Sequence, residues 1–343
     1  MSKSIRVRAP LRLGLAGGGT DIPSFSDIYG GAVLNVTINR YAYAMLDALN
    51  NNSIIFEALD KQIRVEKTTD DELNLDGNLD LHIAAYKFMM NNYNNGKFLP
   101  MHLSTFCEAP PGSGLGSSST IVVAIVKALA ESINQPLDDY EIANIAFKIE
   151  REDCGLRGGK QDQYAATFGG FNFMEFNKNK SVLVNPLRVK NWIKCELESS
   201  LVLFFTSISR ESEKIIKDQE RNVNDDSSKT LEAFSNIKQS AHDMKESILM
   251  GRFDVFAEQL RFGWQEKMKT ANSVTNEKIN RIYTSSIEAG AIGGKLSGAG
   301  GGGFMMLYVP TYKRMDVIRC LETFDGKVSS CQFSNVGVQS WIF

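Results

Sequence analysis

The stretch EAPPGSGLGSSST, residues 108–120, stands directly before the apolar segment IVVAIVKALA, residues 121–130. It holds two prolines, glycines at 112, 114 and 116, and three consecutive serines. Glycines let backbone amides approach an anion closely, and hydroxyl side chains cap helices. The helix predicted after the stretch adds unpaired N–H groups and a positive dipole end. A capped helix start would explain one serine but not the spaced glycines, so the stretch predicts a phosphate-binding loop.

Two other glycine clusters do not fit the common phosphate-binding motifs. GGK occurs at 158–160 and at 293–295, but Gln161 and Leu296 follow where a P-loop has serine or threonine. GAGGGG, residues 298–303, has the spacing of a dinucleotide-binding motif. It precedes the strand-like FMMLYV instead of opening a helix, which excludes the dinucleotide interpretation.

The composition of the chain argues against several classes of protein. A chain of 343 residues suggests about two domains. A net charge of −2 gives no electrostatic case for binding nucleic acid. Five cysteines without a C-x-x-C pair indicate reduced thiols, and three ungrouped histidines disfavour catalysis centred on histidine. The first residues have no apolar signal region and no apolar run reaches membrane length, so we expect a cytoplasmic protein with no membrane partner.

Hydrophobic periodicity predicts an α+β protein with two lobes, divided near Pro186 into residues 1–190 and 191–343. Strands are expected at 5–15, 41–49, 53–59, 62–67, 101–109, 169–176, 181–189, 199–206, 304–309 and 329–338, and helices at 79–93, 120–133 and 136–153. Apolar residues at 231, 234, 237, 241, 244 and 248 predict a buried helical stripe. The polar segment 218–229 is interpreted as a solvated loop, with a mobile lid as the alternative.

Four stretches resemble, in order, the motifs of the GHMP kinases, a family named for galactokinase, homoserine kinase, mevalonate kinase and phosphomevalonate kinase. They are RAPLRLGLAGGGTD (8–21), APPGSGLGSSST (109–120), GGKQDQYAATFGGFNF (158–173) and KLSGAGGGGFMMLYV (295–309). In the first, Gly18 and Gly19 stand where galactokinase-like members have Glu and His. This feature, together with the third stretch, is similar to the heptose 7-phosphate kinase branch, next to the fucokinase-type enzymes.

The resemblance implies a kinase that uses ATP and Mg²⁺. Asp162 would be the catalytic base or would orient the attacking hydroxyl, and Arg12 would keep it ionised and stabilise the transferred charge. Ser117 and Glu150 would be the metal ligands, although Glu150 could instead be a solvated helix-end carboxylate. The nucleotide would contact Pro111, Gly112, Ser113, Gly114, Leu115, Gly116, Ser117, Ser118 and Ser119.

The resemblance also assigns an acceptor site. Asp21 would bind two sugar hydroxyls, beside Thr20 and a backbone opened by Gly17, Gly18 and Gly19. Gly298, Gly300 and Gly301 would approach from the second lobe. A substrate that already carries phosphate needs further cations, and Arg157, Lys160 and Arg210 are the candidates by their position near glycine-rich or strand-end segments.

The reaction implied is phosphorylation of the anomeric hydroxyl of D-glycero-α-D-manno-heptose 7-phosphate to the 1,7-bisphosphate, in GDP-heptose biosynthesis. The partners are ATP and this sugar phosphate, and the protein would be a monomer or homodimer. The implied fold has a left-handed βαβ unit in the first lobe and a ferredoxin-like second lobe. A sugar kinase for an unphosphorylated substrate such as fucose, and a non-catalytic sugar or nucleotide sensor, remain as alternatives.

Overall fold

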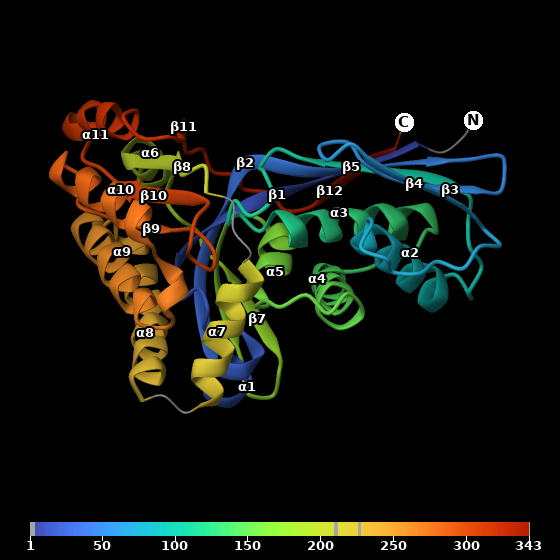
Figure 1. Cartoon of the computed structure of the whole chain (residues 1–343), viewed down its shortest axis with the longest axis horizontal. Helices are drawn as coiled ribbons and strands as arrows, with labels where there is room; N and C mark the ends of the chain where they lie inside the picture. Colours follow the sequence, from blue (N-terminus) through green and yellow to red (C-terminus); the bar gives the residue numbers. More distant parts are fainter. Residues whose placement is uncertain (1–3, 209–211, 226–227, 343) are drawn as a thin grey trace.

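The computed structural model of the chain describes residues 4–208, 212–225 and 228–342. Figure 1 shows two lobes, with β3 (Ser53–Ala58), β4 (Ile63–Thr68) and α2 (Asp80–Tyr93) at the far end of one and α9 (Phe253–Met268), α10 (Glu277–Glu288) and α11 (Arg314–Leu321) in the other. In the part of the chain that is described, no helix combines the length and apolar character needed to cross a membrane. All five cysteines are free thiols, as predicted.

The first lobe is built on an eight-stranded sheet. Its main path runs β12 (Gln339–Ile342), β1 (Ser4–Ala16), β2 (Gly31–Ala48), β5 (Met101–Cys107), β3 (Ser53–Ala58) and β4 (Ile63–Thr68), and β2 also pairs with β6 (Phe171–Phe176), which pairs with β7 (Val182–Pro186). Strands β3 and β5 are parallel, and every other pair in this sheet is antiparallel. The left-handed sense of the β3–α2–β5 crossover stays a prediction.

Helices cover one face of this sheet. They are α2 (Asp80–Tyr93), α3 (Ser117–Ser132), α4 (Asp139–Lys148) and α5 (Gln161–Phe168), and Figure 1 shows them on the same side. Nearly every residue of α3 from Ser119 to Ala130 is buried, which explains why its sequence is apolar on all sides. Helix α4 begins at a capping box formed by Asp138 and Glu141. It ends five residues earlier than predicted, in a π-helical turn, η1 (Ile149–Asp153).

The second lobe has the predicted ferredoxin-like arrangement. Its antiparallel sheet runs β11 (Lys327–Ser330), β8 (Leu201–Phe205), β10 (Phe304–Tyr308) and β9 (Gly293–Leu296). Helices follow β8 and β10, so the chain order is strand, helices, two strands, helix, strand. These helices include α8 (Ser228–Met250), α9 (Phe253–Met268), α10 (Glu277–Glu288) and α11 (Arg314–Leu321), and α6 (Asn191–Ser200) precedes β8.

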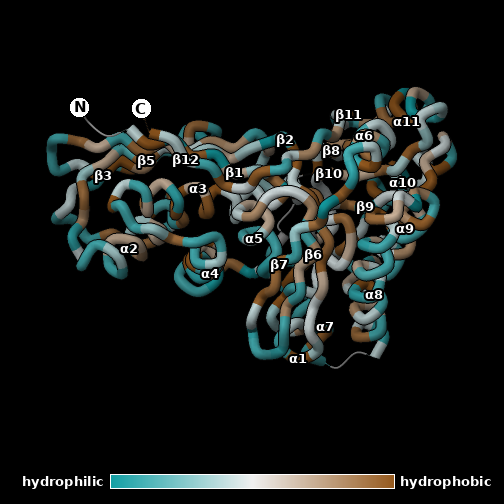
Figure 2. Tube along the Cα trace, turned by 180° about the vertical axis from the view of Figure 1, so that it is seen from behind, coloured by the Kyte–Doolittle hydropathy of each residue, from teal (hydrophilic) through white to brown (hydrophobic). Residues whose placement is uncertain are grey.

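Helix α8 carries the predicted stripe, with Phe234, Ile237, Ala241, Met244 and Ile248 buried. It packs against α9 of its own lobe and against β2 of the first lobe. Strand β12 likewise returns the chain end to β1, and Figures 1 and 2 show the two ends of the chain close together. The division at residue 190 stays a prediction, and the last strand belongs to the first sheet.

Two sequence predictions about secondary structure were wrong. Within the segment 218–229, predicted as a loop, α7 (Ser212–Asn224) continues to Asn224 and α8 begins at Ser228. The buried side of α7 consists of Ile215, Gln219 and Val223. The polar Gln219 side chain donates to Thr270 Oγ1 at 2.7 Å. A buried polar residue in the middle of the stripe hid the helical period from a hydropathy argument.

The segment 329–338, predicted as a strand, belongs to β11 only at its start. Beyond Ser330 the backbone of this segment makes hydrogen bonds to two different elements. Gln332 and Ser334 bond to β2, and Val338 bonds to Thr167 at the end of α5. A Cβ at Gly337 would lie 1.8 Å from the Thr167 carbonyl oxygen, so the chain crosses α5 at a contact that only glycine permits.

The packing of Phe234 against Phe25, with ring centroids 5.0 Å apart, joins α8 to α1 (Pro23–Tyr29). Phe234 is fully buried, so Phe234→Ala should lower the unfolding free energy by about 3–5 kcal/mol. Leu249→Ala, at an exposed position of the same helix, is the control and should have little effect. Urea denaturation measures both, and equal unfolding free energies would contradict this packing.

Candidate active site

A cleft of about 310 Å³ lies between the lobes. Its wall includes the glycine-rich loop of residues 111–119, the turn at Gly19–Ile22, the segment 156–162, and part of α7. The second lobe contributes Lys267 of α9 and the backbone of Gly298 and Ala299. The cleft therefore brings together all four motifs that the sequence identified.

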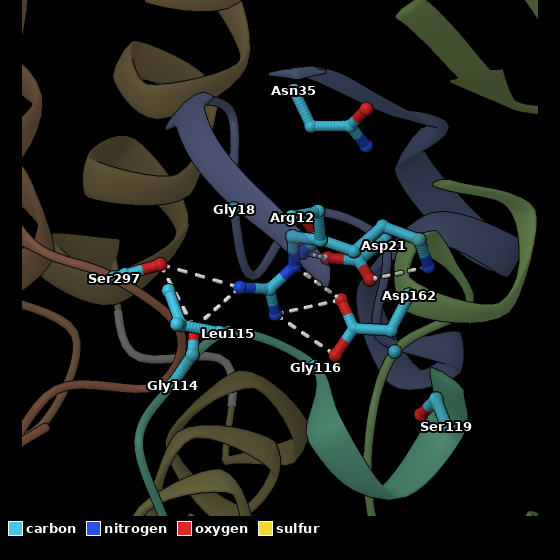
Figure 3. A network of polar contacts seen from close by, with 12 residues as sticks. Arg12, Gly18, Asp21, Asn35, Gly114, Leu115, Gly116, Ser119, Asp162 and Ser297 are labelled. Carbon is cyan, nitrogen blue, oxygen red and sulfur yellow. Dashed lines mark hydrogen bonds and ion pairs between the residues drawn. The ribbon is translucent and has the colours of Figure 1, made fainter. Parts of the chain in front are cut away.

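Arg12 and Asp162 form a two-pronged ion pair at this cleft (Figure 3). Arg12 Nε donates to one carboxylate oxygen at 2.7 Å and Nη2 to the other at 2.8 Å. The third nitrogen, Nη1, donates to the carbonyl of Gly114 and lies 3.3 Å from Ser297 Oγ. The Arg12 side chain is 4% exposed and that of Asp162 20% exposed, so the carboxylate is the partner that remains open to the cleft.

The glycine-rich loop depends on backbone conformations that favour glycine. Gly112, Gly114 and Gly116 have φ of 72°, 79° and 79°. A Cβ at Gly116 would lie 3.2 Å from Asp162 Cγ, so this glycine lets the loop approach the carboxylate. Leu115 points the other way and is fully buried in the core.

The serines after the loop are not helix caps, contrary to the sequence prediction. The N-cap of α3 is Gly116, in the left-handed region, and Ser117 is already helical. The hydroxyls therefore make other contacts: Ser117 Oγ lies 3.1 Å from Ser113 Oγ, and Ser118 donates to Glu150. These serines lie at the N-terminus of α3, which faces the cleft.

Glu150 is 2% exposed yet borders the cleft from the π-turn η1. Its oxygens accept from Ser118 Oγ at 2.8 Å, Ser119 Oγ at 2.6 Å and Gln163 Nε2 at 2.6 Å. It is therefore a buried hydrogen-bonded carboxylate, which rules out the solvated alternative.

The oxygens near Ser117 and Glu150 suit Mg²⁺, which is bound through one or two carboxylates, phosphate and several waters. Within residues 4–208, 212–225 and 228–342, no group of three or more His, Cys, Asp or Glu side chains forms a complete metal cage.

The turn after β1 is held by Asp21, which is 2% exposed. Its carboxylate accepts from Gly19 N at 3.0 Å, Gln161 N at 3.0 Å and Gln161 Nε2 at 3.1 Å. Thr20 Oγ1 bonds the backbone of Gly17 and Ala32. Asp21 borders the cleft, while Thr20 and Gly17 shape the turn behind it.

The glycine-rich stretch of residues 298–303 mainly contacts the phosphate loop of residues 111–119. Phe304 N donates to the carbonyl of Ser113 at 2.8 Å, and a Cβ at Gly303 would lie 2.3 Å from that oxygen. Gly300 and Gly301 pack against Val274, and of the three predicted contacts only Gly298 borders the cleft. The motif therefore closes the second lobe onto the phosphate loop.

The basic residues proposed for a second phosphate differ in position. Arg157 borders the cleft and pairs with Glu220 of α7. Lys160 is buried with its Nζ 2.9 Å from Asp27 Oδ1 and is not part of the cleft wall. Arg210 lies outside the described residues. Two cations that sequence reasoning missed, Arg151 and Lys267, do border the cleft.

The sequence also left the base pocket of the nucleotide unassigned. Beyond the glycine-rich loop the cleft continues along apolar side chains, including Leu81, Cys107, Ala109 and Ile121, with Lys61 at its edge. Leu81 lies on α2 and Ile121 on α3, Cys107 ends β5 with Ala109 just after it, and Lys61 lies between β3 and β4. Their signal is hydrophobicity, which does not distinguish a pocket residue from a core residue in the sequence.

Comparisons with known proteins agree with this geometry. The family model described as GHMP kinases N terminal domain matches residues 80–170, and GHMP kinases C terminal matches residues 242–319. A Campylobacter jejuni protein named D-glycero-alpha-D-manno-heptose 7-phosphate kinase is 46% identical over 339 residues, covering 99% of both chains. A Bacteroides fragilis L-fucokinase/L-fucose-1-P guanylyltransferase is 26% identical over 88% of this chain and 34% of its own length. A crystal structure titled D-glycero-D-manno-heptose 1-phosphate kinase, from Bacteroides thetaiotaomicron, superposes with a TM-score of 0.84 at 42% identity, covering 98% of each chain.

Behind the cleft, Lys295 of β9 reaches the carbonyl of Leu15 at 3.3 Å. Its burial, with Lys267 and Arg12 nearby, lowers the pKa of this lysine to about 7. An unfolded lysine keeps its proton up to about pH 10. Between these values the unfolded chain binds one more proton than the folded chain, so this group makes the protein more stable as pH rises.

Lys295→Met removes that dependence. Compared with the variant, the wild type should gain unfolding free energy between pH 7 and about pH 9.5, and the difference should level off below pH 7. Urea denaturation across this range measures it, with Lys278→Met, on the exposed side of α10, as the control for losing one lysine charge. A difference that is constant with pH would mean that Lys295 is charged throughout.

Proposed function

The chain belongs to the GHMP kinase family, and we propose that it is an ATP-dependent kinase for a phosphorylated heptose. The reaction is transfer of the γ-phosphoryl group of ATP to the anomeric hydroxyl of D-glycero-α-D-manno-heptose 7-phosphate, which yields the 1,7-bisphosphate for GDP-heptose synthesis. The Arg12–Asp162 pair beside a glycine-rich anion loop carries the proposal. The 46% identity to the heptose 7-phosphate kinase supports the substrate.

ATP would bind with its phosphates on the amides of residues 112–119 and its base toward Leu81 and Ile121. Glycines on this loop place no side chain between the backbone and the phosphates. Ser117 and Glu150 would hold Mg²⁺, which would neutralise charge on the β- and γ-phosphates. The dipole of α3 points its positive end at the same place.

Asp162 would act on the acceptor hydroxyl. Arg12 binds both carboxylate oxygens and fixes their direction, and each oxygen keeps a lone pair for a hydroxyl in the cleft. As the hydroxyl oxygen bonds to the γ-phosphorus and the bond to the β-phosphate breaks, the proton passes to Asp162. The guanidinium beside it stabilises the negative charge on the transferred group.

The acceptor would lie between Asp21, the backbone of Gly18 and Gly19, and the 157–159 segment. The Asp21 carboxylate accepts three hydrogen bonds from the protein. About one acceptor position therefore remains for a sugar hydroxyl. Arg157 would stand near the sugar's own phosphate. The names of the two similar heptose kinases place that phosphate differently, at position 7 in one and position 1 in the other.

Two alternatives have different support. The 26% identity to the L-fucokinase/L-fucose-1-P guanylyltransferase gives some support to a kinase for unphosphorylated fucose. A sensor without activity is disfavoured, because Arg12, Asp162 and Ser117 are all present and all border the cleft.

Asp162→Asn should lower kcat by about 10²–10⁴-fold, the usual contribution of a positioned base. The change also leaves a buried arginine without its ionic partner, so ATP binding and unfolding must be measured beside turnover. Asp243→Asn, on the surface of α8, is the matched control. Near-normal turnover in folded Asp162→Asn would remove this residue from the mechanism.

The substrate itself is tested by coupled ADP release with D-glycero-D-manno-heptose 7-phosphate, the same heptose without phosphate, the 1-phosphate, and L-fucose. A site built for a dianion loses charged hydrogen bonds of roughly 1.5–3 kcal/mol each when the phosphate is missing. The 7-phosphate should therefore exceed the free heptose in kcat/KM by at least about 10²-fold. Equal values would contradict the proposal and favour a fucokinase-type enzyme.

A further inference from the structure

Gln163 lies in the first turn of α5, directly after Asp162, and is fully buried. Its Nε2 lies 2.6 Å from Glu150 Oε2 and 3.2 Å from Ser119 Oγ. A carboxylate only accepts hydrogen bonds, so the NH₂ group of the amide must be the end that faces Glu150. A single turn of α5 therefore carries the proposed base and a side chain bound to the proposed metal ligand.

The two oxygens of the Glu150 carboxylate have different surroundings. Oε2 accepts from Gln163 and from Ser119 Oγ, and both of these donors are buried. Oε1 accepts from Ser118, which is exposed, and Arg151 Nη1 lies 3.5 Å from it, too far for a good hydrogen bond. The two bonds to Oε2 use both of its lone pairs. Oε1 is therefore the oxygen that keeps an acceptor position for a metal ion.

The backbone beneath Glu150 is the π-helical turn η1, in which Cys154 N bonds to the carbonyl of Ile149 five residues earlier at 3.0 Å. Such turns are frequent at functional sites. The hydrogen bonds that fix the Glu150 side chain come from other elements, from two serines at the start of α3 and from Gln163 of α5. The direction of this carboxylate therefore depends on how α3 and α5 pack around η1.

Holding one carboxylate oxygen matters for Mg²⁺ in particular, because this ion requires nearly ideal octahedral geometry. A carboxylate that turned about its own axis would exchange its two oxygens. The bonds from Gln163 and Ser119 to the same oxygen oppose that rotation. Removal of a side chain that holds a metal ligand in this way usually lowers metal affinity by about 10–100-fold.

We propose that Gln163 is a positioning residue for the metal ligand Glu150, which it holds together with Ser119 so that Oε1 stays available to Mg²⁺. This inference rests on the proposed function, in which Glu150 binds the metal, and adds a residue that controls how well it does so. Because Asp162 and Gln163 are adjacent, the same turn of α5 sets the positions of the base and of the metal ligand.

The first test measures binding of a non-hydrolysable ATP analogue by calorimetry, with and without Mg²⁺. In Gln163→Met the gain in affinity that Mg²⁺ provides should fall by about 10-fold or more, while affinity without Mg²⁺ should stay the same. A merely structural role would change both values. Gln239→Met is the matched control, because Gln239 also donates to a carboxylate, that of Asp243 at 2.9 Å, but on the exposed face of α8.

The second test titrates Mg²⁺ during turnover of heptose 7-phosphate. Gln163→Met should need about 10-fold more Mg²⁺ than the wild type, and its kcat should recover at high Mg²⁺ with KM for the sugar unchanged. Asp162→Asn should show no such recovery, because it removes the proposed base and leaves the metal ligand in place. A loss in Gln163→Met that excess Mg²⁺ does not restore would contradict a role through the metal.

The outcomes separate this inference from the proposed substrate. A wild type that phosphorylates only an unphosphorylated sugar would overturn the substrate, and the binding test on Gln163 would still apply. An unchanged Mg²⁺-dependent gain in Gln163→Met, shown to be folded by urea denaturation, would overturn the role of Gln163. Should that variant fail to fold, Ser119→Ala removes the other donor to Oε2, and an unchanged gain there would overturn the proposal. A wild type with no Mg²⁺-dependent gain would overturn the metal role of Glu150 as well.

Discussion

The bonding of one buried guanidinium constrains the whole centre of this molecule. Arg12 lies on β1 and is 4% exposed, where an unmatched charge would be costly. Its partners are Asp162, Gly114 and Ser297, which are 150, 102 and 285 residues away in the chain. Because all three must be in place for the cation to be satisfied, this residue links the start of α5, the phosphate loop and the second lobe.

The lobes meet through backbone as much as through side chains. Phe304 N bonds to the Ser113 carbonyl, α8 packs on β2, and Thr206 N bonds to Gly303 beside the same junction. Close approach at Gly303 and Ser113 requires that no side chain intervene. The glycine-rich motif of the second lobe therefore supports the phosphate loop from behind, so the geometry of the anion site depends on both lobes.

Anion binding at this site depends on nearby cations and backbone amides, and the net charge of −2 on the whole chain does not favour it. Arg12, Lys267 and Lys295 lie close enough that the first two help to lower the pKa of Lys295 to about 7. Arg12 of the first lobe and Lys267 of the second both border the cleft, so the cations at this site come from both lobes.

Sequence reasoning predicts the elements whose signal is local. The left-handed glycines of residues 112–116, the apolar helix α3 and the stripe on α8 follow from turn chemistry and periodicity, and the motif resemblance paired Arg12 with Asp162. Other features depend on tertiary packing. They are the helical state of α7, the bonds of the serines to Glu150 in place of a cap on α3, and the pairing of Lys160 with Asp27 while Lys267 borders the cleft. The difference arises because these two kinds of feature depend on interactions over different distances along the chain. Period and propensity report which face of an element is buried, whereas the partner of a buried charge is set by how segments 100 or more residues apart pack together.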